Sequence, residues 1–216
     1  MVAIFDGSTQ ERNAFVRYLG ILYFGSPGDI PFSRYINRAY RDFSRTLRGF
    51  AKLPGHDEVF SQATLKLSDA IKALAKKKSW TQQSFDACHD AICQDLMNIF
   101  PNNLLHYGQA QKWLNMTLKY VFTALATGIL EEEERRLIEG IESCYQYAHL
   151  PIDNIVLEAL KKQGGPAIKR RWSKIDVSQY REFQADLRAR YVECPLDMDF
   201  LLWKGDGAEL TRKTKQ

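Results

Sequence analysis

The sequence predicts an all-α fold, and three observations lead to this prediction. Apolar residues recur every three or four positions along most of the chain, which is the spacing of an amphipathic helix. Glycine, proline and asparagine punctuate these periodic runs. Strand-like alternation is confined to a short candidate strand at residues 2–5. We therefore expect about nine helices in one compact unit.

Four helices are expected in the first half of the chain. The apolar stripe of the first helix consists of Phe15, Tyr18, Leu19 and Leu22. The third helix ends in three lysines, a favourable charge for a helix C-terminus, and Ser79 or Thr81 can cap the fourth. The predicted ranges are residues 10–24, 32–50, 56–78 and, after that cap, a segment that ends at residue 99.

Five further helices are expected in the second half. The second of these is strongly charged and has Glu131 and Arg135 four residues apart, as in helices that carry surface ion pairs. Asp153 opens the third, which stops at Gln163-Gly-Gly-Pro166. The predicted ranges are residues 109–127, 131–147, 153–163, 177–191 and 196–203. Residues 207–216 are expected to form a basic, flexible tail.

We expect residues 1–206 to form a single helical domain, because a chain of 216 residues can bury one substantial core. The alternative is two small helical subdomains with a cleft between them. One subdomain would contain residues 51–130, and the other would contain residues 1–50 and 131–206. Hydrophobic residues make up 45% of the chain and charged residues 26%, which is typical of a folded globular protein.

Composition argues against several classes of protein. The net charge of +4 permits contact with phosphate groups without requiring it. The cysteines, at positions 88, 93, 144 and 194, form no C-x-x-C pair and no metal-ligand spacing with the histidines, so we expect no metal, disulfide framework or cofactor. No stretch approaches the roughly 20 apolar residues that span a bilayer, and the N-terminus lacks a secretion-signal pattern. We expect a cytoplasmic protein that does not act at a membrane.

The residues with the clearest chemistry lie in two segments. On a helix, Lys112, Asn115 and Lys119 share one side. A lysine amine becomes a useful nucleophile only when burial or a second cation lowers its pKa, and Lys119 lies two turns from Lys112. In the second segment, Asp153 follows Pro151 at a helix start. The simplest interpretation of Asp153 is a helix cap that accepts hydrogen bonds from backbone N–H groups.

Together the two segments resemble the helix-hairpin-helix DNA glycosylases, most closely the archaeal 8-oxoguanine glycosylase branch. The resemblance covers roughly residues 104–160 and is carried by Gln111-Lys112, by Lys119 seven residues later, and by the Pro-x-Asp sequence that ends in Asp153. In that family a lysine after the hairpin attacks the sugar C1′ of a flipped nucleotide, and an aspartate stabilises the developing positive charge. The resemblance implies that Lys112 is the nucleophile and Asp153 the carboxylate.

The same segments are also similar to small bacterial proteins that carry G-x-A-Q-K-x-x-N-x-x-L-K-Y, P-I-D and W-x-x-I-D sequences. This second similarity implies no activity. In the present chain the three sequences begin at Gly108, Pro151 and Trp172.

The resemblance to the glycosylases implies a protein that excises a damaged base from double-stranded DNA through a lysine Schiff base. Two alternatives concern the site itself: Lys119 supplies the amine in place of Lys112, or His149 reaches the same site as Asp153. The alternative function is a non-enzymatic helical protein that binds nucleic acid or another protein.

Three groups of residues are candidates for nucleic-acid contact. The resemblance places Gly108 and Gln109 at the hairpin turn, where the family binds a DNA phosphate through backbone amides. Arginines along the predicted helix 32–50 suit a phosphate backbone; they are Arg34, Arg38, Arg41, Arg45 and Arg48. A basic loop beside Trp172 contains Lys169, Arg170 and Arg171. The alternative for the arginines is a solvated face or ion pairs with acidic residues between positions 131 and 142.

Overall fold

The computed structural model describes residues 9–203 and 209–214, with side chains described from residue 13 onward. The described residues contain nine α-helices and five 3-10 segments. They contain no β-strand, and one isolated bridge joins Tyr191 to Arg212. The predicted all-α fold is confirmed. The candidate strand at residues 2–5 lies outside the described residues.

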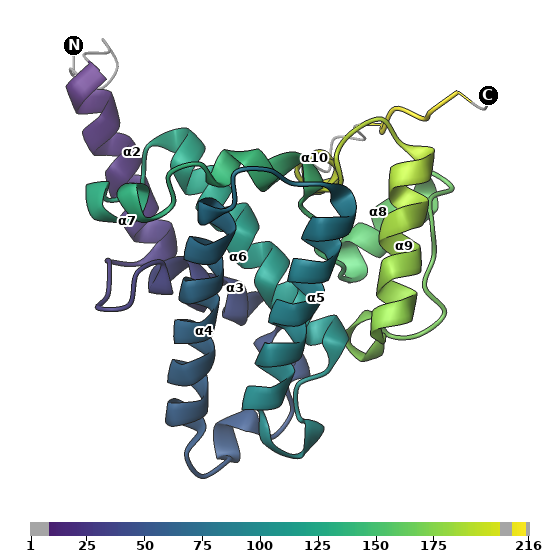
Figure 1. Cartoon of the computed structure of the whole chain (residues 1–216), viewed down its shortest axis with the longest axis horizontal. Coiled ribbons are helices and arrows are strands. Elements are labelled where there is room, and N and C mark those ends of the chain that lie inside the picture. The colour runs from purple at the N-terminus through teal and green to yellow at the C-terminus, as the bar shows by residue number, and fades with distance from the viewer. Residues whose placement is uncertain (1–8, 204–208, 215–216) are drawn as a thin grey trace.

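The helices follow the chain in the order shown by the colours of Figure 1. The α-helices are α2 (Thr9–Phe24), α3 (Ser33–Phe43), α4 (His56–Lys76), α5 (Gln82–Ile99), α6 (Tyr107–Thr127), α7 (Glu132–Leu137), α8 (Asn154–Lys162), α9 (Val177–Arg190) and α10 (Pro195–Trp203). The 3-10 segments are η1 (Ser44–Thr46), η2 (Phe50–Lys52), η3 (Pro101–Asn103), η4 (Ile141–Tyr147) and η5 (Trp172–Lys174).

Helix α6 is the centre of the structure. Every residue from Tyr107 to Phe122 is buried, and α3, α5, α9 and η5 pack against this helix. Figure 1 shows α4 and α5 side by side in front of α6, with α9 on one flank. A helix that is buried on all sides must find partners inside the protein for its polar side chains as well as its apolar ones.

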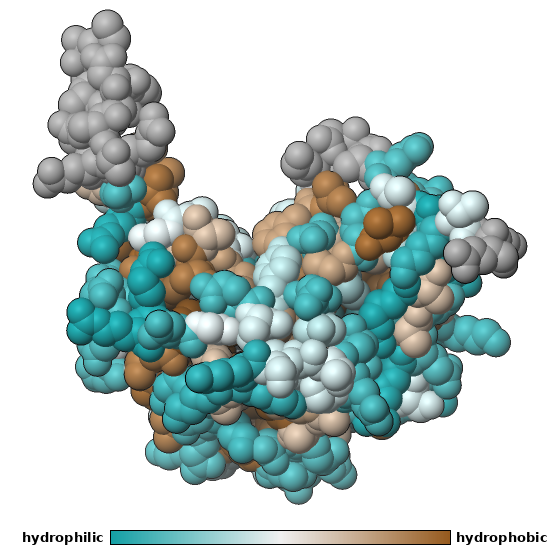
Figure 2. Space-filling model, turned by 45° about the horizontal axis from the view of Figure 1, so that its top comes forward, coloured by the Kyte–Doolittle hydropathy of each residue, from teal (hydrophilic) through white to brown (hydrophobic). Residues whose placement is uncertain are grey.

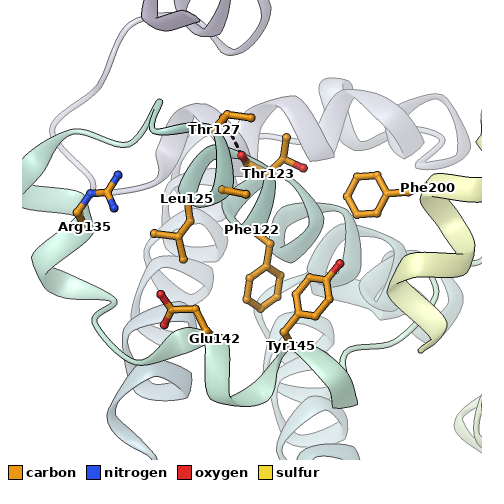
Figure 3. A pocket seen from close by; sticks show the side chains of 9 residues that line it. Phe122, Thr123, Leu125, Thr127, Arg135, Glu142, Tyr145 and Phe200 are labelled. Atoms are coloured by element: carbon orange, nitrogen blue, oxygen red, sulfur yellow. Dashed lines mark hydrogen bonds between the residues drawn. The ribbon is translucent and has the colours of Figure 1, made fainter. Parts of the chain in front are cut away.

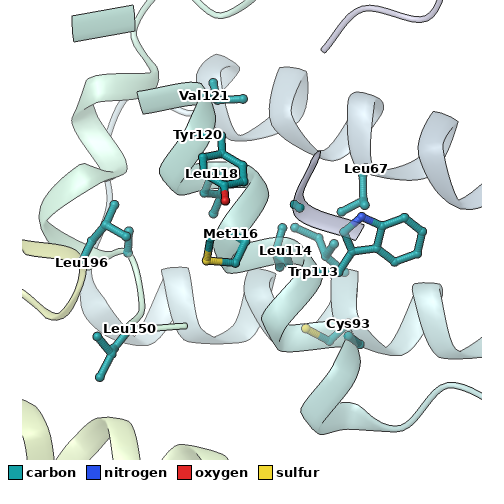
Figure 4. Close-up of a cluster of buried hydrophobic side chains, with 14 of the residues drawn as sticks. Leu67, Cys93, Trp113, Leu114, Met116, Leu118, Tyr120, Val121, Leu150 and Leu196 are labelled. Carbon is teal, nitrogen blue, oxygen red and sulfur yellow. The ribbon is translucent and has the colours of Figure 1, made fainter. Parts of the chain in front are cut away.

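The apolar core surrounds Trp113 of α6. Its indole Nε1–H donates a hydrogen bond to the Ile36 carbonyl of α3 at 3.0 Å. Figure 4 shows Trp113 beside Leu67 on one side of α6, and Leu150 and Leu196 on the other. The buried apolar cluster includes residues from both halves of the chain, so α6 joins the early helices to the late ones.

The second predicted helix is shorter than its sequence pattern suggested. The sequence predicted one helix over residues 32–50, whereas α3 ends at Phe43 and η1 follows. The Thr46 hydroxyl donates to the Phe43 carbonyl at 2.8 Å, and such local bonds compete with helical hydrogen bonding. Gly49 then has a φ of 87°, a left-handed conformation that favours glycine. The five predicted arginines therefore do not share one helix face.

The predicted helix over residues 131–147 is also interrupted. It consists of α7 and η4, with Gly140 between them at a φ of 91°. The Ser143 hydroxyl donates to the Gly140 carbonyl at 2.8 Å and holds the start of η4. Charge pairing at four-residue spacing, which supported the longer helix, is satisfied within the single turn of α7 by Glu132 and Arg136 at 3.0 Å.

Residues 209–214 lie along the end of α9. The Val192 N–H donates to the Thr211 carbonyl at 2.9 Å, and the Lys213 N–H donates to the Arg190 carbonyl at 2.8 Å. Leu210 is buried between these contacts. The expected flexible tail over residues 207–216 is therefore wrong for this part of the chain, because its backbone finds partners at the end of α9.

None of the helices in the described residues is long and apolar enough to cross a membrane. The four cysteines are free thiols. Burial raises the pKa of Cys144 and of Cys194 to about 12. A thiol with so high a pKa is protonated and poorly nucleophilic near neutral pH.

We expect Trp113→Phe to lower the free energy of unfolding by about 1–3 kcal/mol, because the change opens a cavity and removes the donor to the Ile36 carbonyl. The matched control is Trp203→Phe. Trp203 is 54% exposed, and its replacement should change the stability by less than about 0.5 kcal/mol. Urea unfolding followed by circular dichroism measures both. Equal effects would contradict the central position of Trp113.

Candidate functional site

The start of α6 is fixed against η5 through Gly108. The Gly108 N–H donates to the Ile175 carbonyl at 3.2 Å. A Cβ at this position would lie 2.0 Å from the Trp172 carbonyl oxygen, so only glycine lets η5 cross α6 this closely. The resemblance implied that this amide binds a DNA phosphate. In the structure it is already bonded within the fold, and the expected role of Gly108 is corrected accordingly.

The Gln109 side chain likewise makes its hydrogen bonds within the protein. Its side chain is buried and its Nε2 donates to the Thr46 carbonyl at 3.0 Å. Its Oε1 accepts the His106 N–H at 2.9 Å, which caps the start of α6. Gln109 therefore holds α6 against η1, and the nucleic-acid contact expected of it is corrected in the same way.

Two buried glutamines hold the segment between η4 and α8 against the core. Gln111 of α6 donates to the Ile152 carbonyl at 3.1 Å and accepts the Ile152 N–H at 3.3 Å. Gln184 of α9 donates to the Leu150 carbonyl at 2.7 Å and accepts the Leu150 N–H at 3.3 Å. Each side chain pairs with both backbone groups of one residue, as a neighbouring strand would. The position of Asp153, one residue later, follows from these contacts.

Lys112 and Asp153 form an ion pair. The Lys112 Nζ lies 2.5 Å from the Asp153 Oδ2. The Asp153 Oδ1 accepts the Val156 N–H at 2.9 Å, so the predicted helix cap is confirmed. The Lys112 side chain is 2% exposed and the Asp153 side chain 15%. One carboxylate therefore caps α8, pairs with a buried amine and reaches the surface.

A second ion pair joins Lys119 to Asp199 of α10. Asp199 is fully buried, and its Oδ1 has no hydrogen-bond partner among the described residues. Burial raises the pKa of Asp199, whereas the charges of Lys119 and Lys112 lower it. The rings of Phe200 and Trp203 lie 4.7 and 5.6 Å from the Lys119 Nζ. The two ion pairs interact and form one cluster with no net charge.

Asn115 connects Gln111 to a network of polar side chains from α5 and α9. Its Nδ2 donates to the Gln111 Oε1 at 3.1 Å and to the Tyr180 hydroxyl at 2.8 Å. Its Oδ1 lies 2.9 Å from the His89 Nε2. All of these groups are buried, and buried polar groups normally satisfy one another in this way.

His149 belongs to this network rather than to the Asp153 site. Its Nδ1 lies 2.9 Å from the Tyr180 hydroxyl, and its Nε2 lies 2.7 Å from the Asp86 Oδ1. Burial, reinforced by the neighbouring His89, lowers the pKa of His149 to about 3. The imidazole is therefore neutral, with its Nε2–H donating to Asp86. The sequence-based alternative that placed His149 beside Asp153 is wrong in this respect, because both ring nitrogens face α5 and α9.

A basic hollow lies at the N-terminal end of α6. It has a volume of about 580 Å³ and no acidic residue in its lining. It brings together three residues predicted from the sequence, Arg45, Arg48 and Arg171, and adds Lys174 and His106. The remaining lining residues are Thr46, Asn102, Asn103, Leu104, Asn154, Trp172 and Ser173.

The lining of the basic hollow includes the residue next to Asp153, but neither Lys112 nor Asp153 itself. Asn154, which lines the hollow, directly follows Asp153. Lys112 lies six residues after His106, or about 9 Å along the helix axis. The Lys174 ammonium contacts the His106 Nε2; partial burial and this charge lower the pKa of His106. The hollow is therefore electropositive through its arginines and Lys174 even when His106 is neutral.

Two of the predicted arginines are bound to acidic residues and do not reach this hollow. Arg34 is 3% exposed and pairs with Glu134 at 2.8 Å, with Glu131 at 4.0 Å. Arg38 pairs with Asp42 at 2.6 Å. For Arg34 the alternative of an ion pair with the acidic segment is confirmed, and its expected contact with nucleic acid is wrong because the guanidinium is buried.

The remaining predicted basic residues are exposed but lie outside the basic hollow. Arg41 lies near the end of α3, and Arg170 precedes η5. Lys169 is also exposed and lines a separate surface depression with Glu182 and Asp186. These acidic neighbours reduce the attraction of that depression for phosphate.

An apolar hollow occupies the opposite end of α6. Its volume is also about 580 Å³. Figure 3 shows Phe122 and Tyr145 pointing into it, with Phe200 on the α10 side. Arg135 and Glu142 are its two charged residues. The other lining residues are Thr123, Leu125, Ala126 and Thr127. Phe200 connects this hollow to the Lys119–Asp199 pair.

Sequence reasoning missed Gln111 as a clamp, Lys174 as part of the basic hollow, and Asp199 as a buried partner. Asp199 gave a usable signal, because an acidic residue within the apolar run Met198-Asp-Phe-Leu-Leu202 must find a cation when the helix is buried. Gln111 and Lys174 gave no such signal, because polar residues at their positions are equally common on solvated helix faces and loops.

Among the described residues, no group of three or more His, Cys, Asp or Glu side chains is placed to hold a metal ion. Comparison of this chain with protein-family models, with curated proteins and with solved structures found no match.

We expect the stability of the protein to fall as the pH is lowered from about 6.5 towards 4.5. In this range the unfolded chain binds a proton at His149, whereas the folded chain, in which the pKa of His149 is about 3, does not. The slope of the unfolding free energy against pH is proportional to the difference in bound protons between the unfolded and folded states. His149→Gln should therefore reduce this difference by up to about one proton. Urea unfolding at several pH values measures the slope.

The matched control for the pH experiment is His56→Gln. The His56 side chain is 40% exposed, so this variant removes an exposed imidazole, and we expect it to change the slope less than His149→Gln does. An unchanged slope in His149→Gln, or an equal change in His56→Gln, would show that His149 is not the buried group responsible.

Proposed function

We propose that this protein binds double-stranded DNA and excises a damaged base, with Lys112 as the nucleophile and Asp153 as its carboxylate partner. The observation that carries the proposal is the 2.5 Å contact between the Lys112 Nζ and the Asp153 Oδ2. The two residues are 41 positions apart in the chain. A lysine and an aspartate in these roles are what the glycosylase resemblance implied.

In the proposed reaction, Lys112 transfers its proton to Asp153 and its free amine attacks the sugar C1′ of a flipped nucleotide. The N-glycosidic bond breaks, and its electron pair leaves with the base, which takes up a proton. Asp153 passes its proton to the leaving base, and the carboxylate that this restores stabilises the positive charge on the sugar. The C1′–O4′ bond then breaks as a proton moves from the Lys112 nitrogen to O4′, which leaves an imine with Lys112. Loss of a C2′ proton and of the 3′ phosphate from this imine cleaves the strand.

Lys112 is a better candidate than Lys119 because of its surroundings. The partner of Lys119 is fully buried in α10, whereas Asp153 is partly exposed and directly precedes Asn154, which lines the basic hollow. Lys112 itself is 2% exposed. The proposal therefore requires DNA binding to open a path to the Lys112 amine after its proton has passed to Asp153.

Borohydride trapping on duplexes that carry several different lesions tests the chemistry. We expect a covalent adduct with the wild-type chain, about the same yield with Lys169→Gln, and a loss of at least about a hundredfold with Lys112→Gln, since the imine cannot form without the amine. Lys119→Gln should retain the adduct. The proposal is wrong if no lesion gives an adduct, or if the adduct survives both Lys112→Gln and Lys119→Gln.

Asp153→Asn separates the chemical role from the structural one. Asparagine caps helices about as well as aspartate, so α8 should stay capped while the carboxylate charge is lost. We expect the variant to fold, as measured by circular dichroism, and to trap DNA more slowly. Normal trapping in Asp153→Asn would remove the carboxylate from the proposed reaction.

The second candidate function is nucleic-acid binding without catalysis. It is favoured by the basic hollow, whose lining has four arginine or lysine side chains and no acid, and by the enclosure of Lys112. A protein of this kind would use Lys112 and Asp153 only to hold α8 on α6.

Salt-dependent binding tests the use of the hollow. Arg45→Glu combined with Arg171→Glu should weaken duplex binding at least about tenfold and reduce its dependence on salt, because fewer counterions are released. Arg41→Glu combined with Arg170→Glu is the matched control, since both arginines are exposed outside the hollow and the net charge changes equally. Fluorescence anisotropy with a labelled duplex at several salt concentrations measures both. Equal loss in the control would show that only net charge matters.

A further inference from the structure

Helix α2 presents a stripe of large apolar side chains to solvent. The stripe consists of Phe15, Tyr18, Leu19 and Leu22, which are 44, 57, 46 and 64% exposed. Their spacing of i, i+3, i+4 and i+7 places them on one face of the helix. An apolar stripe with this spacing normally packs against another element, and no element within residues 9–203 or 209–214 covers it in α2.

The body of the protein contacts a different side of α2. Gly20 lies directly on Ile129, because a Cβ at Gly20 would be 2.4 Å from the Ile129 Cγ2. The ring of Phe24 lies 4.8 Å from that of Tyr35 and 5.3 Å from that of Tyr120. Val16, one turn before Gly20, is partly buried against the core. These contacts fix α2 on the molecule without using the exposed stripe.

The position of α2 makes the stripe accessible. Figure 1 shows α2 projecting from the remaining helices towards the N-terminus. In Figure 2, apolar surface gathers at the upper left of the molecule, which is hollowed between this side and the upper right. A second molecule can therefore approach the stripe without meeting the helices that surround α6.

We infer that α2 pairs in an antiparallel manner with α2 of a second copy of this chain, stripe against stripe. The stripe is symmetric about its centre, since Phe15 and Leu22 flank Tyr18 and Leu19. In a two-fold pair, Phe15 of one copy lies opposite Leu22 of the other, and the middle residues meet at the axis. Such a surface is complementary to itself, as a two-fold interface requires.

The exposed area suits a weak dimer. The stripe residues are about half exposed, and large side chains present about 150–250 Å² each. Leucine and isoleucine side chains are smaller, so together with Ile21, which is 43% exposed, the stripe offers roughly 400 Å² per copy and about 800 Å² in the pair, below the size of standard specific interfaces. We therefore expect a dissociation constant in the micromolar range.

The charge of α2 argues against a membrane as the occupant of the stripe. The charged residues of α2 are Glu11, Arg12 and Arg17, which give the helix a net charge of only +1. Helices that lie on anionic membranes carry many lysines or arginines on their polar face. A second copy requires no such charge, because the contact is made by apolar side chains alone.

Sedimentation velocity over about two decades of protein concentration tests the inference. We expect the wild-type chain to pass from monomer to dimer, and Leu22→Glu to raise the dissociation constant at least about tenfold. Leu65→Glu is the matched control, because Leu65 is 50% exposed on α4, away from the stripe. Leu22 is so exposed that its variant should melt, by circular dichroism, at the wild-type temperature.

A mixing experiment tests the antiparallel arrangement. A Phe15→Lys chain and a Leu22→Glu chain should each dimerise poorly alone and should form a heterodimer when mixed, because the lysine faces the glutamate. A monomeric wild-type chain, or a dimer that Leu22→Glu leaves intact, would overturn the inference. Failure of the mixture would overturn the antiparallel pairing. Binding of the monomer to phosphatidylcholine–phosphatidylserine vesicles that Leu22→Glu abolishes would assign the stripe to a membrane instead.

Discussion

The rest of the structure depends on satisfying the buried polar side chains of α6. Gln111, Lys112, Asn115 and Lys119 lie on a helix that is buried on all sides, and a polar or charged group without a partner is costly in such a place. Their partners come from the Ile152–Asp153 segment, α5, α9 and α10. The late helices are therefore positioned by specific polar contacts with α6 as well as by apolar packing.

This arrangement means that the candidate site and the core share their residues. Two buried ion pairs are an expensive way to hold helices together, because apolar side chains of similar size often stabilise a protein equally well or better. Breaking either pair by removing one partner is more costly still, since it leaves an unpaired buried charge. Asparagine at position 153 keeps the cap of α8 but leaves Lys112 without an anion, so the stability of Asp153→Asn has to be measured together with its trapping rate.

The sequence was sufficient for the all-α class and for the cap at Asp153, because both depend on local patterns. The helix ends at Phe43 and Leu137 were missed, because the apolar period continues past both points. A local hydrogen bond of Thr46 follows the first end, and the left-handed Gly140 follows the second. Periodicity also shows that a stripe is apolar without showing what covers it. The sequence therefore did not predict that the stripe of α2 is exposed. It also did not predict that the arginines of the predicted helix 32–50 have different surroundings.

The two ion pairs, Lys112–Asp153 and Lys119–Asp199, differ in how a ligand could reach their lysine. Displacing α10 would leave the fully buried Asp199 and Lys119 without each other, and an anionic nucleic acid offers Asp199 no favourable replacement. Displacing Asp153 costs the cap of α8, about 1 kcal/mol, but once the Lys112 proton has passed to the carboxyl group, as the proposed reaction requires, both separated groups are neutral. Asn154 already lines the basic hollow. In the proposed reaction, entry from that side therefore leaves no unpaired buried charge and is the physically cheaper route to the amine.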